Sequence, residues 1–410
     1  MGLEPLNKPI AFVVPWYGED IAGGAERLCR EYVHHLSQAG IAVEVLTTCV
    51  RDFSSNWNKN HYRPKVVEKA GMKIHRLPVR RRDSHQFDIV NFKLLNNLAV
   101  TAYEEHLFFF ESVRSEQLEQ FLAREGHRYH LVFMPYCFGT TFEGLRQVNF
   151  HGFLWPCLHH ERYAMLRGSH KIHQSVRGLI FNSDSEQQLA SSLYAIERVP
   201  QIVLGMGVEA QERADPEKFR RKYRIKNPYL ICVGRKDMTK NTHVLVGYFA
   251  HYLEENPDTQ LDLVLLGPGD VEVPSAIARR VHNPGYVSEE MKRAALTGAE
   301  LLIQPSARES FSIVLMEAWM AGTPVAVNEH CHVGLEHCRR SNGGLYFGNY
   351  AEFEGVVRLL TGDKELAHQL AANGQHFVRE NYRWDQLIEG FTRFIRENAG
   401  QGPRPKPEGN

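Results

Sequence analysis

The chain has 410 residues, and its 48 lysines and arginines balance its 48 aspartates and glutamates. This length suffices for two domains with sizeable cores, and the balanced charge gives no sign of a nucleic-acid partner. No apolar stretch reaches the roughly 18 residues of a membrane span, and residues 1–9 are too polar for a secretory signal. Seven cysteines without regular spacing indicate reduced thiols, so we expect a cytoplasmic protein.

The chain opens with a strand–turn–helix–strand unit. Residues 10–14 are an apolar run of strand length, and Gly23 and Gly24 supply a turn. Residues 25–39 carry apolar side chains at helical spacing, and residues 43–47 read as the next strand. This order predicts the beginning of a parallel sheet.

The same pattern continues and then restarts in the second half. Residues 52–82 are more polar and predict a long excursion with short strands. Further strands are predicted at residues 131–134, 153–155 and 178–181, and then at 229–234, 263–267, 301–304 and 324–327. Two serial α/β units therefore emerge, with a boundary near residues 204–208.

The segment from Glu309 to Glu317 is the most informative candidate site. It follows an apolar strand, and Ser310, Phe311 and Ser312 precede an apolar stretch that can form a helix. The first amides of a helix starting near Ser310 or Ser312 would attract phosphate. Glu309 would lie beside that phosphate and Glu317 about two turns further along. A nucleotide-sugar needs such amides and carboxylates, although an amphipathic helix with two exposed glutamates has the same pattern.

A second phosphate candidate follows the strand at residues 229–234. Gly234, Arg235 and Lys240 lie where this strand turns into a helix. Ligands bind at that edge of open α/β sheets, and two cations there could hold a diphosphate. A solvated basic loop is the alternative.

Two weaker candidates lie in the first half. The small residues Gly23 and Gly24 would let the backbone approach a sugar or phosphate closely, or they form an ordinary tight turn. His159 follows a short strand and could face a cleft. Because His159 and its neighbour His160 would point in opposite directions, they are unsuited to binding one metal ion.

The cysteine- and histidine-rich segment near the end of the chain lacks metal-site spacing. His330, Cys331 and His332 are followed by His337 and Cys338, which is not the spacing of a zinc finger or knuckle. Packed thiols and loop histidines are the favoured interpretation, and no metal site is predicted.

Membrane contact has two candidate segments. Residues 80–82 are three arginines that could meet anionic lipid. Residues 107–110 (Leu-Phe-Phe-Phe) could be interfacial, although core packing is favoured.

In their order and spacing, several motifs together resemble those of the retaining GT-B-fold glycosyltransferases of family 4, of the bacterial surface-glycan type. The similarity covers nearly the whole chain. It rests on residues 15–18 (Pro-Trp-Tyr-Gly), 23–26, 156–159, 205–208, Gly234 and Arg235 with Lys240, Glu309 to Glu317, and 341–345.

The resemblance implies two Rossmann-like domains that face each other across a cleft. Residues 1–203 would form the acceptor domain, and a helix at residues 384–398 would cross back to it. Residues 204–383 would bind the nucleotide-sugar. Residues 400–410, rich in Gly, Pro and Lys, are expected to be disordered.

The resemblance also assigns roles to the candidate residues. Arg235 and Lys240 would bind the diphosphate, Glu317 the ribose hydroxyls and Glu309 the donor-sugar hydroxyls. The implied donor site comprises Gly23, Gly24, Gly234, Arg235, Lys240, Glu309, Ser310, Phe311, Ser312 and Glu317, with Gly24 facing the diphosphate and the Phe311 and Ser312 amides assisting Glu309. His159 would contact the transferred sugar. The family pattern has an aspartate where this chain has His160, and Arg308 has no assigned role.

These roles imply transfer of a hexosyl unit from a nucleotide-diphosphate sugar to a glycan, lipid-linked or small-molecule hydroxyl, in surface polysaccharide synthesis. The residues with catalytic roles would be His159, Arg235, Lys240 and Glu309, with no metal and no other cofactor. The protein would act in the cytoplasm, with peripheral contact at the inner face of the membrane. A nucleotide-sugar-binding protein without turnover, or a phosphorylase or epimerase of the same architecture, is the alternative.

Overall fold

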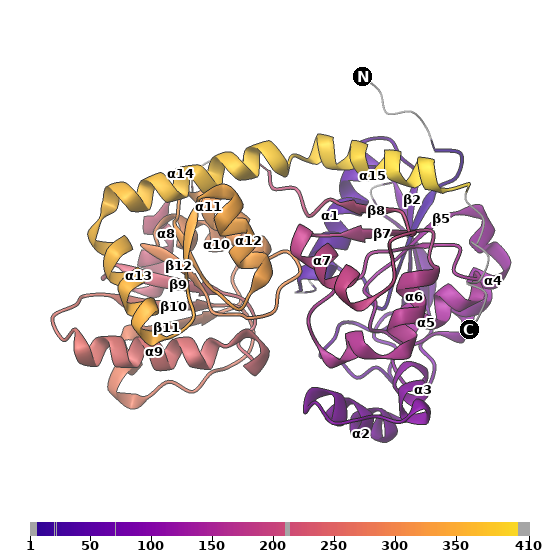
Figure 1. The fold of residues 1–410 in the computed structure, drawn as a ribbon, viewed down its shortest axis with the longest axis horizontal. Helices are drawn as coiled ribbons and strands as arrows, with labels where there is room; N and C mark the ends of the chain where they lie inside the picture. Colours follow the sequence, from indigo (N-terminus) through magenta and orange to yellow (C-terminus); the bar gives the residue numbers. More distant parts are fainter. Residues whose placement is uncertain (1–5, 20, 22, 70, 210–213, 401–410) are drawn as a thin grey trace. The chain divides into compact units, whose positions relative to one another are not determined.

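The computed structural model describes residues 6–19, 21, 23–69, 71–209 and 214–400. The chain divides into two compact units (Figure 1). The first unit comprises Met1–Met206 and Trp384–Asn410, and the second comprises Gly207–Arg383. The expected disorder of residues 400–410 lies, from residue 401 onward, outside the described residues.

The first unit is built on a sheet of eight strands in the order β3-β4-β2-β1-β5-β6-β7-β8. All neighbouring strands run parallel except β3, which is antiparallel to β4. The strands are β1 (Ile10–Val14), β2 (Val43–Thr48), β3 (Lys65–Lys69), β4 (Met72–Leu77), β5 (His130–Phe133), β6 (Phe153–Leu154), β7 (Gly178–Phe181) and β8 (Gln201–Val203).

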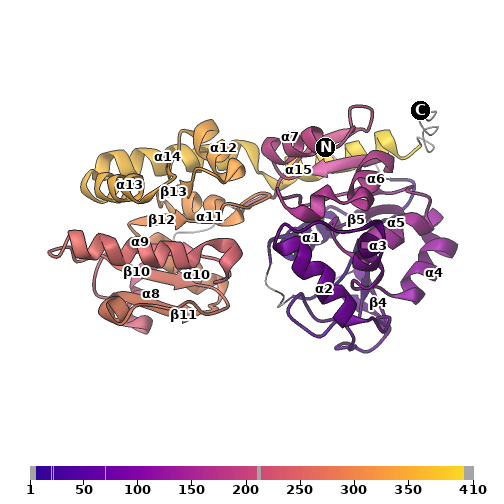
Figure 2. The same cartoon turned by 60° about the horizontal axis from the view of Figure 1, so that its bottom comes forward.

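Helices cover this sheet, and α2 and α3 lie side by side (Figures 1 and 2). The helices are α1 (Gly24–Gln38), α2 (Ser84–Leu95), α3 (Ala102–Phe110), α4 (Glu116–Glu125), α5 (Gly139–Gln147), α6 (Arg167–Ser175), α7 (Asp184–Leu193) and α15 (Trp384–Asn398), with short 3-10 turns η1 (Gly126–Arg128) and η2 (Arg162–Met165).

Aromatic packing fastens the last helix, α15, to the first unit. The ring of Phe391 lies 6.1 Å from that of Phe12 in β1, and Tyr32 of α1 packs 4.6 Å from Trp155. The Tyr32 hydroxyl donates a hydrogen bond to the Gly205 carbonyl over 2.9 Å. These four side chains are fully or almost fully buried, so the hydrophobic effect anchors the helix.

The second unit contains a parallel sheet of six strands in the order β11-β10-β9-β12-β13-β14. The strands are β9 (Tyr229–Val233), β10 (Asp262–Leu266), β11 (Val281–Gly285), β12 (Leu301–Gln304), β13 (Val325–Asn328) and β14 (Gly344–Phe347). The chain leaves β9 toward β10 on one side and leaves β12 toward β13 on the other. The point between β9 and β12 is therefore a topological switch point, where open α/β sheets bind ligands.

The helices of the second unit pack in two groups. Helices α8, α10, α11 and α14 form a continuous series of contacts, with α10 and α11 side by side (Figure 2). Helix α13 contacts both α9 and α14, and so links the two groups. The elements are α8 (Pro216–Tyr223), α9 (Thr242–Glu255), α10 (Glu289–Thr297), α11 (Ile313–Ala321), α12 (His332–Ser341), α13 (Tyr350–Gly362) and α14 (Lys364–Asn381), with 3-10 turns η3 (Met238–Lys240) and η4 (Ser275–Arg280).

Most of the predicted strands are confirmed to within one or two residues. The run at residues 178–181 coincides with β7, and the run at 301–304 coincides with β12. The excursion at residues 52–82 contains β3 and β4. Among the described strands, β8, β11 and β14 were not predicted. Pro284 lies inside β11, and proline is unusual in a strand but tolerated at the sheet edge, where β11 lies.

Candidate functional site

An ion pair bridges the two loops at the switch point of the second sheet. The Lys240 ammonium, which follows β9, lies 2.6 Å from the Glu309 carboxylate, which follows β12. The side chain of Lys240 is 24% exposed and that of Glu309 is 13% exposed. The structure therefore brings these two predicted site residues together at the carboxyl edge of the sheet, partly open to solvent.

Gln304 at the end of β12 supports this pair. Its side-chain amide donates to the Glu309 carboxylate over 3.3 Å and to the Ser312 hydroxyl over 3.2 Å. Gln304 is only 6% exposed. The sequence analysis missed this residue, although a polar side chain ending an apolar strand was the available signal.

The turn into α11 has an unusual backbone at Ser312. This residue has φ 62° and ψ 60°, in the left-handed region that residues other than glycine seldom adopt. Its hydroxyl accepts from Gln304, and within the described chain it makes no cap bond to α11. Backbone strain of this kind is common at ligand sites, and the helix dipole adds a positive end there.

Phe311 faces the interior of the second unit rather than solvent. Its ring is 4% exposed, and its carbonyl accepts a hydrogen bond from His337 Nε2 over 3.0 Å. Burial lowers the pKa of His337 to about 4, so this imidazole is neutral and donates its Nε2 proton. Phe311 can therefore offer a ligand only its backbone amide.

The loop after β9 holds the other predicted cation. Arg235 lies 3.4 Å from Asp237, and the two side chains are 46% and 38% exposed. Asp237 accepts from the amides of Thr239 and Lys240 over 2.9 and 3.2 Å and so fixes the turn η3. Burial opposes ionisation of Asp237, but the hydrogen bonds from Thr239 and the charge of Arg235 lower its pKa on balance.

The glycine that ends β9 lies against a second glycine. Gly234 has φ 156°, and a Cβ added to Gly267 would lie 2.0 Å from the Gly234 carbonyl oxygen. Gly267 is therefore required for this close approach of two backbones. The ammonium of Lys236, the third cation of the loop, donates to the Gly267 carbonyl and is committed to the fold.

Glu317 lies in the second turn of α11 and is paired with a residue that the sequence analysis did not single out. Lys292 of α10 places its ammonium 2.8 Å from the Glu317 carboxylate. The side chains of Lys292 and Glu317 are 13% and 11% exposed. Each of the two predicted carboxylates thus has its own lysine, supplied by a different element.

In the first unit, Gly23 and Gly24 start α1. Gly23 has φ 145°, and a Cβ on Gly24 would meet nothing within 4 Å among the described residues. Glu26, in the first turn, accepts from the Trp16 indole over 2.7 Å. The turn therefore has open space at Gly24 among the described residues, and the Glu26 carboxylate of the same helix is held by Trp16.

His159 follows β6 and is partly exposed, with His160 more exposed beside it. Its Nδ1 lies 3.9 Å from Glu161, which accepts from the Tyr136 hydroxyl over 2.8 Å. Behind this loop, the buried Glu186 accepts from the Leu158 amide over 2.5 Å. The sequence analysis missed Glu186, which ties the His159 loop to the start of α7.

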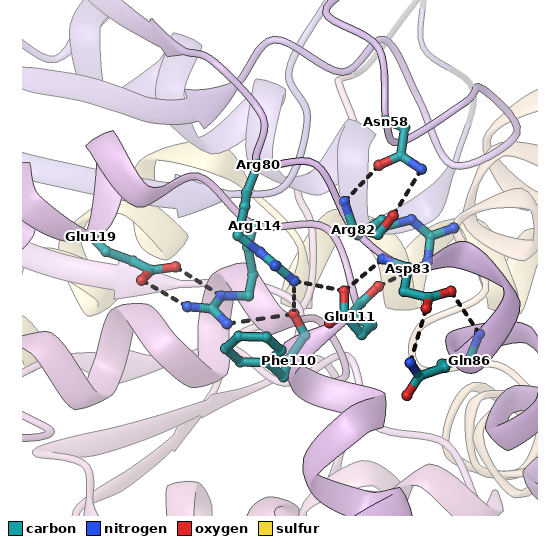
Figure 3. Close-up of polar contacts among 9 residues, drawn as sticks. All are labelled: Asn58, Arg80, Arg82, Asp83, Gln86, Phe110, Glu111, Arg114 and Glu119. Carbon is teal, nitrogen blue, oxygen red and sulfur yellow. Dashed lines mark hydrogen bonds and ion pairs between the residues drawn. The ribbon is translucent and has the colours of Figure 1, made fainter.

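The arginine segment predicted as a lipid contact is largely committed to the protein (Figure 3). Arg80 lies 2.7 Å from the Glu111 carboxylate, and Arg82 donates to the Glu111 carbonyl over 2.8 Å. Arg114 forms a second pair with Glu119 at 2.9 Å. Arg80 and Arg82 are therefore committed to contacts within the chain, whereas Arg81 is exposed, and lipid contact by this segment stays a prediction.

The aromatic run at residues 107–110 packs inward, as the favoured interpretation predicted. Phe108 and Phe109 are 3% and 2% exposed. Large apolar side chains are instead exposed on α2, where Ile89, Phe92 and Leu95 are 46%, 62% and 57% exposed. No described helix is long and apolar enough to cross a membrane.

Histidines and cysteines near α12 are scattered between interior and surface. Cys331, His337 and Cys338 are buried, and His330 and His332 are exposed. All seven cysteines are free thiols. Across the described residues, no three or more His, Cys, Asp or Glu side chains are grouped so that they could hold a metal ion.

The two Rossmann-like units define the class of fold. The structure resembles sucrose-phosphate synthase from Thermosynechococcus elongatus with a TM-score of 0.71 and 16% identity, over 95% of this chain and 99% of that one. It also resembles Anabaena HepE in complex with UDP and glucose, with a TM-score of 0.67 and 14% identity, over 95% and 100% of the two chains. The predicted pair of Rossmann-like domains of GT-B type is therefore confirmed.

Sequence comparisons point to the same class in the second unit. Residues 215–377 match the family model "Glycosyl transferases group 1". The D-inositol 3-phosphate glycosyltransferase of Jonesia denitrificans is 24% identical over 247 residues, which are 55% of this chain and 58% of that protein. The trehalose synthase of Rubrobacter xylanophilus is 23% identical over 43% of this chain and 45% of that protein. The chain thus spans about half the length of these curated relatives, and the match to the family model lies within the second unit.

Proposed function

We propose that this protein is a retaining glycosyltransferase that moves a hexosyl unit from a nucleotide-diphosphate sugar to a hydroxyl acceptor. One observation carries the proposal. Lys240 and Glu309 meet at 2.6 Å across the switch point between β9 and β12, inside the region that matches the family model. A cation, a carboxylate and the start of α11 are the groups that a diphosphate and a sugar require.

In this proposal the donor exchanges partners with the ion pair. The phosphate oxygens take the Lys240 ammonium, with Arg235 and the first amides of α11 as further donors. Glu309 then accepts hydrogen bonds from the sugar hydroxyls, while Gln304 keeps its carboxylate in place. Glu317 accepts hydrogen bonds from the ribose hydroxyls, for which both carboxylate oxygens offer acceptor sites.

The chemistry follows from where charge develops. Breaking the bond between the anomeric carbon and the phosphate oxygen leaves negative charge on the nucleoside diphosphate. Fixed cations and amide dipoles stabilise that charge as it forms, so no metal is required in the proposed reaction. We propose front-face attack, in which the leaving phosphate takes the proton of the acceptor hydroxyl.

The first unit is proposed to serve the acceptor side. His159 would contact the transferred sugar, and Gly24 would allow the backbone to approach the donor. The relatives named for D-inositol 3-phosphate and trehalose support a small-molecule acceptor. A glycan or lipid-linked acceptor in surface polysaccharide synthesis, in the cytoplasm or at the inner membrane face, is the wider form of the proposal.

A donor screen tests the function. Purified protein is incubated with UDP-, GDP- and ADP-hexoses in the presence of EDTA, and release of nucleoside diphosphate is followed with candidate acceptors. We expect acceptor-dependent release from one donor type and a product with the anomeric configuration of the donor, read by NMR. Binding without release would identify a nucleotide-sugar-binding protein, and a requirement for inorganic phosphate would identify a phosphorylase. Epimer formation without acceptor would identify an epimerase.

A further inference from the structure

Lys292 joins two carboxylates of unequal burial. Its ammonium lies 2.8 Å from Glu317 in α11 and 2.7 Å from Glu289, which is three residues earlier in α10. Glu317 is 11% exposed, whereas Glu289 is 62% exposed. The lysine therefore reaches inward from the first turn of α10 to a carboxylate that has lost most of its water.

The contacts of Lys292 with Glu289 and with Glu317 differ in how strongly water screens them. An ion pair with an exposed partner is screened by water and contributes little, so Glu289 is replaceable. A carboxylate that has lost its hydration needs a partner to stay ionised and oriented. Of the two contacts of Lys292, the one with Glu317 therefore carries more weight in orienting a carboxylate.

The position of Lys292 is itself fixed by the fold. Its backbone amide donates to the Ser288 carbonyl over 2.8 Å, in the first turn of α10. Helices α10 and α11 are in contact, which brings the two side chains together (Figure 2). Since an ionised carboxylate has about four acceptor sites, one bond from lysine is compatible with further bonds from hydroxyl groups.

We propose that Lys292 is a positioning residue that orients the Glu317 carboxylate to accept hydrogen bonds from the ribose of the donor nucleotide. This inference rests on the proposed function, because it assumes that a nucleoside diphosphate binds here. It assigns ribose recognition to the ion pair of Lys292 in α10 and Glu317 in α11. Diphosphate recognition belongs to other groups, namely Lys240, Arg235 and the first amides of α11.

Because ribose and diphosphate are assigned to different residues, a change at Lys292 should affect only one of them. Loss of the Lys292 charge should reduce the preference for a ribose over a sugar without hydroxyls, and should leave pyrophosphate binding unchanged. A purely structural role would weaken both ligands together or neither. The ratio of two affinities therefore distinguishes positioning from folding.

The test uses calorimetry on full-length wild type and on Lys292→Met. The ligands are whichever of UDP, GDP and ADP binds wild type most tightly, its 2′,3′-dideoxy analogue, and inorganic pyrophosphate. We expect wild type to prefer the ribonucleotide about tenfold or more, as charge-assisted hydrogen bonds predict. In Lys292→Met we expect the preference to fall to about threefold or less, with pyrophosphate affinity unchanged.

Two matched variants sharpen the result. Glu289→Gln removes the exposed contact of the same lysine and should retain the full wild-type preference. Lys292→Arg keeps the charge and should retain most of it. If Lys292→Met unfolds, the conservative variant Lys292→Gln, which keeps a hydrogen-bond donor without charge, is measured in its place and should lose the preference.

Three outcomes would overturn the inference. A wild-type preference that persists in Lys292→Met, or in Lys292→Gln where the first variant unfolds, would show that Lys292 does not position Glu317. A wild type that binds the nucleotide without any preference for ribose would remove the ribose role from Glu317 and leave the proposed function standing. A wild type that binds none of the three nucleotides would remove the proposed function and this inference with it.

Discussion

The two units use paired charges in opposite ways. In the first unit, Arg80 and Arg82 bind the carboxylate and carbonyl of Glu111, which is 8% exposed (Figure 3). In the second unit, Lys240 and Glu309 bind each other at the carboxyl edge of a parallel sheet and remain partly exposed. In the first arrangement, the arginines bind groups of the chain itself. In the second, the lysine and the glutamate are partly exposed, so a charged ligand can bind to them.

Sequence alone does not separate these two uses. The run at residues 80–82 consists of three arginines, of which Arg80 and Arg82 bind Glu111 and Arg81 is exposed. The loop at Arg235 and Lys240 is no more basic, yet it lies at a switch point. Position in the sheet, rather than the number of charges, distinguishes a candidate site from a structural network.

The largest effect is expected from breaking the first-unit network. Glu111→Gln leaves Arg80 without its carboxylate, and losing one partner of a buried pair costs about 3–5 kcal/mol. We expect a matching fall in the free energy of unfolding, measured by urea titration, with nucleotide affinity unchanged. Glu125→Gln, which removes an exposed partner of Arg128, should leave the unfolding midpoint in place. Equal stability of the two variants would contradict the structural role.

The next effect concerns the second unit. Lys240→Ala should lower turnover about 10²-fold, because it removes one donor to the charge that develops on the leaving group. The thermal unfolding midpoint should fall less than in Glu111→Gln, because Lys240 is 24% exposed and Gln304 still donates to Glu309. Lys218→Ala, which breaks an exposed pair with Glu290, should retain wild-type turnover. Near-normal turnover in Lys240→Ala would remove it from the phosphate role.

Glu317→Gln tests the second carboxylate. A charge-assisted hydrogen bond contributes about 1.5–3 kcal/mol, so nucleotide affinity should fall roughly tenfold or more. The rate of the chemical step at saturating donor should change less. Calorimetry of the nucleotide and single-turnover kinetics separate the two effects, and an unchanged affinity would refute the ribose role.

The last effect is gradual and concerns stability at acid pH. The pKa of His337 falls from 6.5 to about 4 on folding because the ring is buried. The unfolded chain therefore binds the extra proton first, and stability present above pH 6.5 is lost as the pH falls toward 4, by up to about 1.4 kcal/mol per pH unit. Urea midpoints between pH 7 and pH 4.5 should show a shallower loss for His337→Gln than for wild type. The exposed control His330→Gln should follow wild type, and identical slopes for all three proteins would contradict this account.

The sequence predicted the periodic parts of the fold because apolar runs and helical spacing are local signals. Residues 10–14, 178–181 and 301–304 were placed in strands for that reason, and β1, β7 and β12 are where they were expected. The strand β11 was missed because its proline obscured the signal. Edge strands depend on their neighbours more than on their own residues.

The candidate site was predictable only where its residues follow one another in the sequence. Glu309, Ser312 and Glu317 share one strand-to-helix connection, so their relation could be read directly. Gln304 and Lys292 act through contacts that only the folded chain creates, and neither carries a recognisable motif. Sequence reasoning identified both carboxylates and Lys240, but not Gln304 or Lys292.

Nucleotide-sugar binding by a variant that lacks both cations is the sharpest test of whether a diphosphate binds at the carboxyl edge of the second sheet. Calorimetry would compare wild type with the double variant Arg235→Ala/Lys240→Ala, using the donor identified by the screen. The account predicts that affinity falls at least about tenfold while the thermal unfolding midpoint is retained, because two charge-assisted contacts to the diphosphate are lost. An affinity equal to that of wild type would show that the diphosphate does not bind at the carboxyl edge of the second sheet.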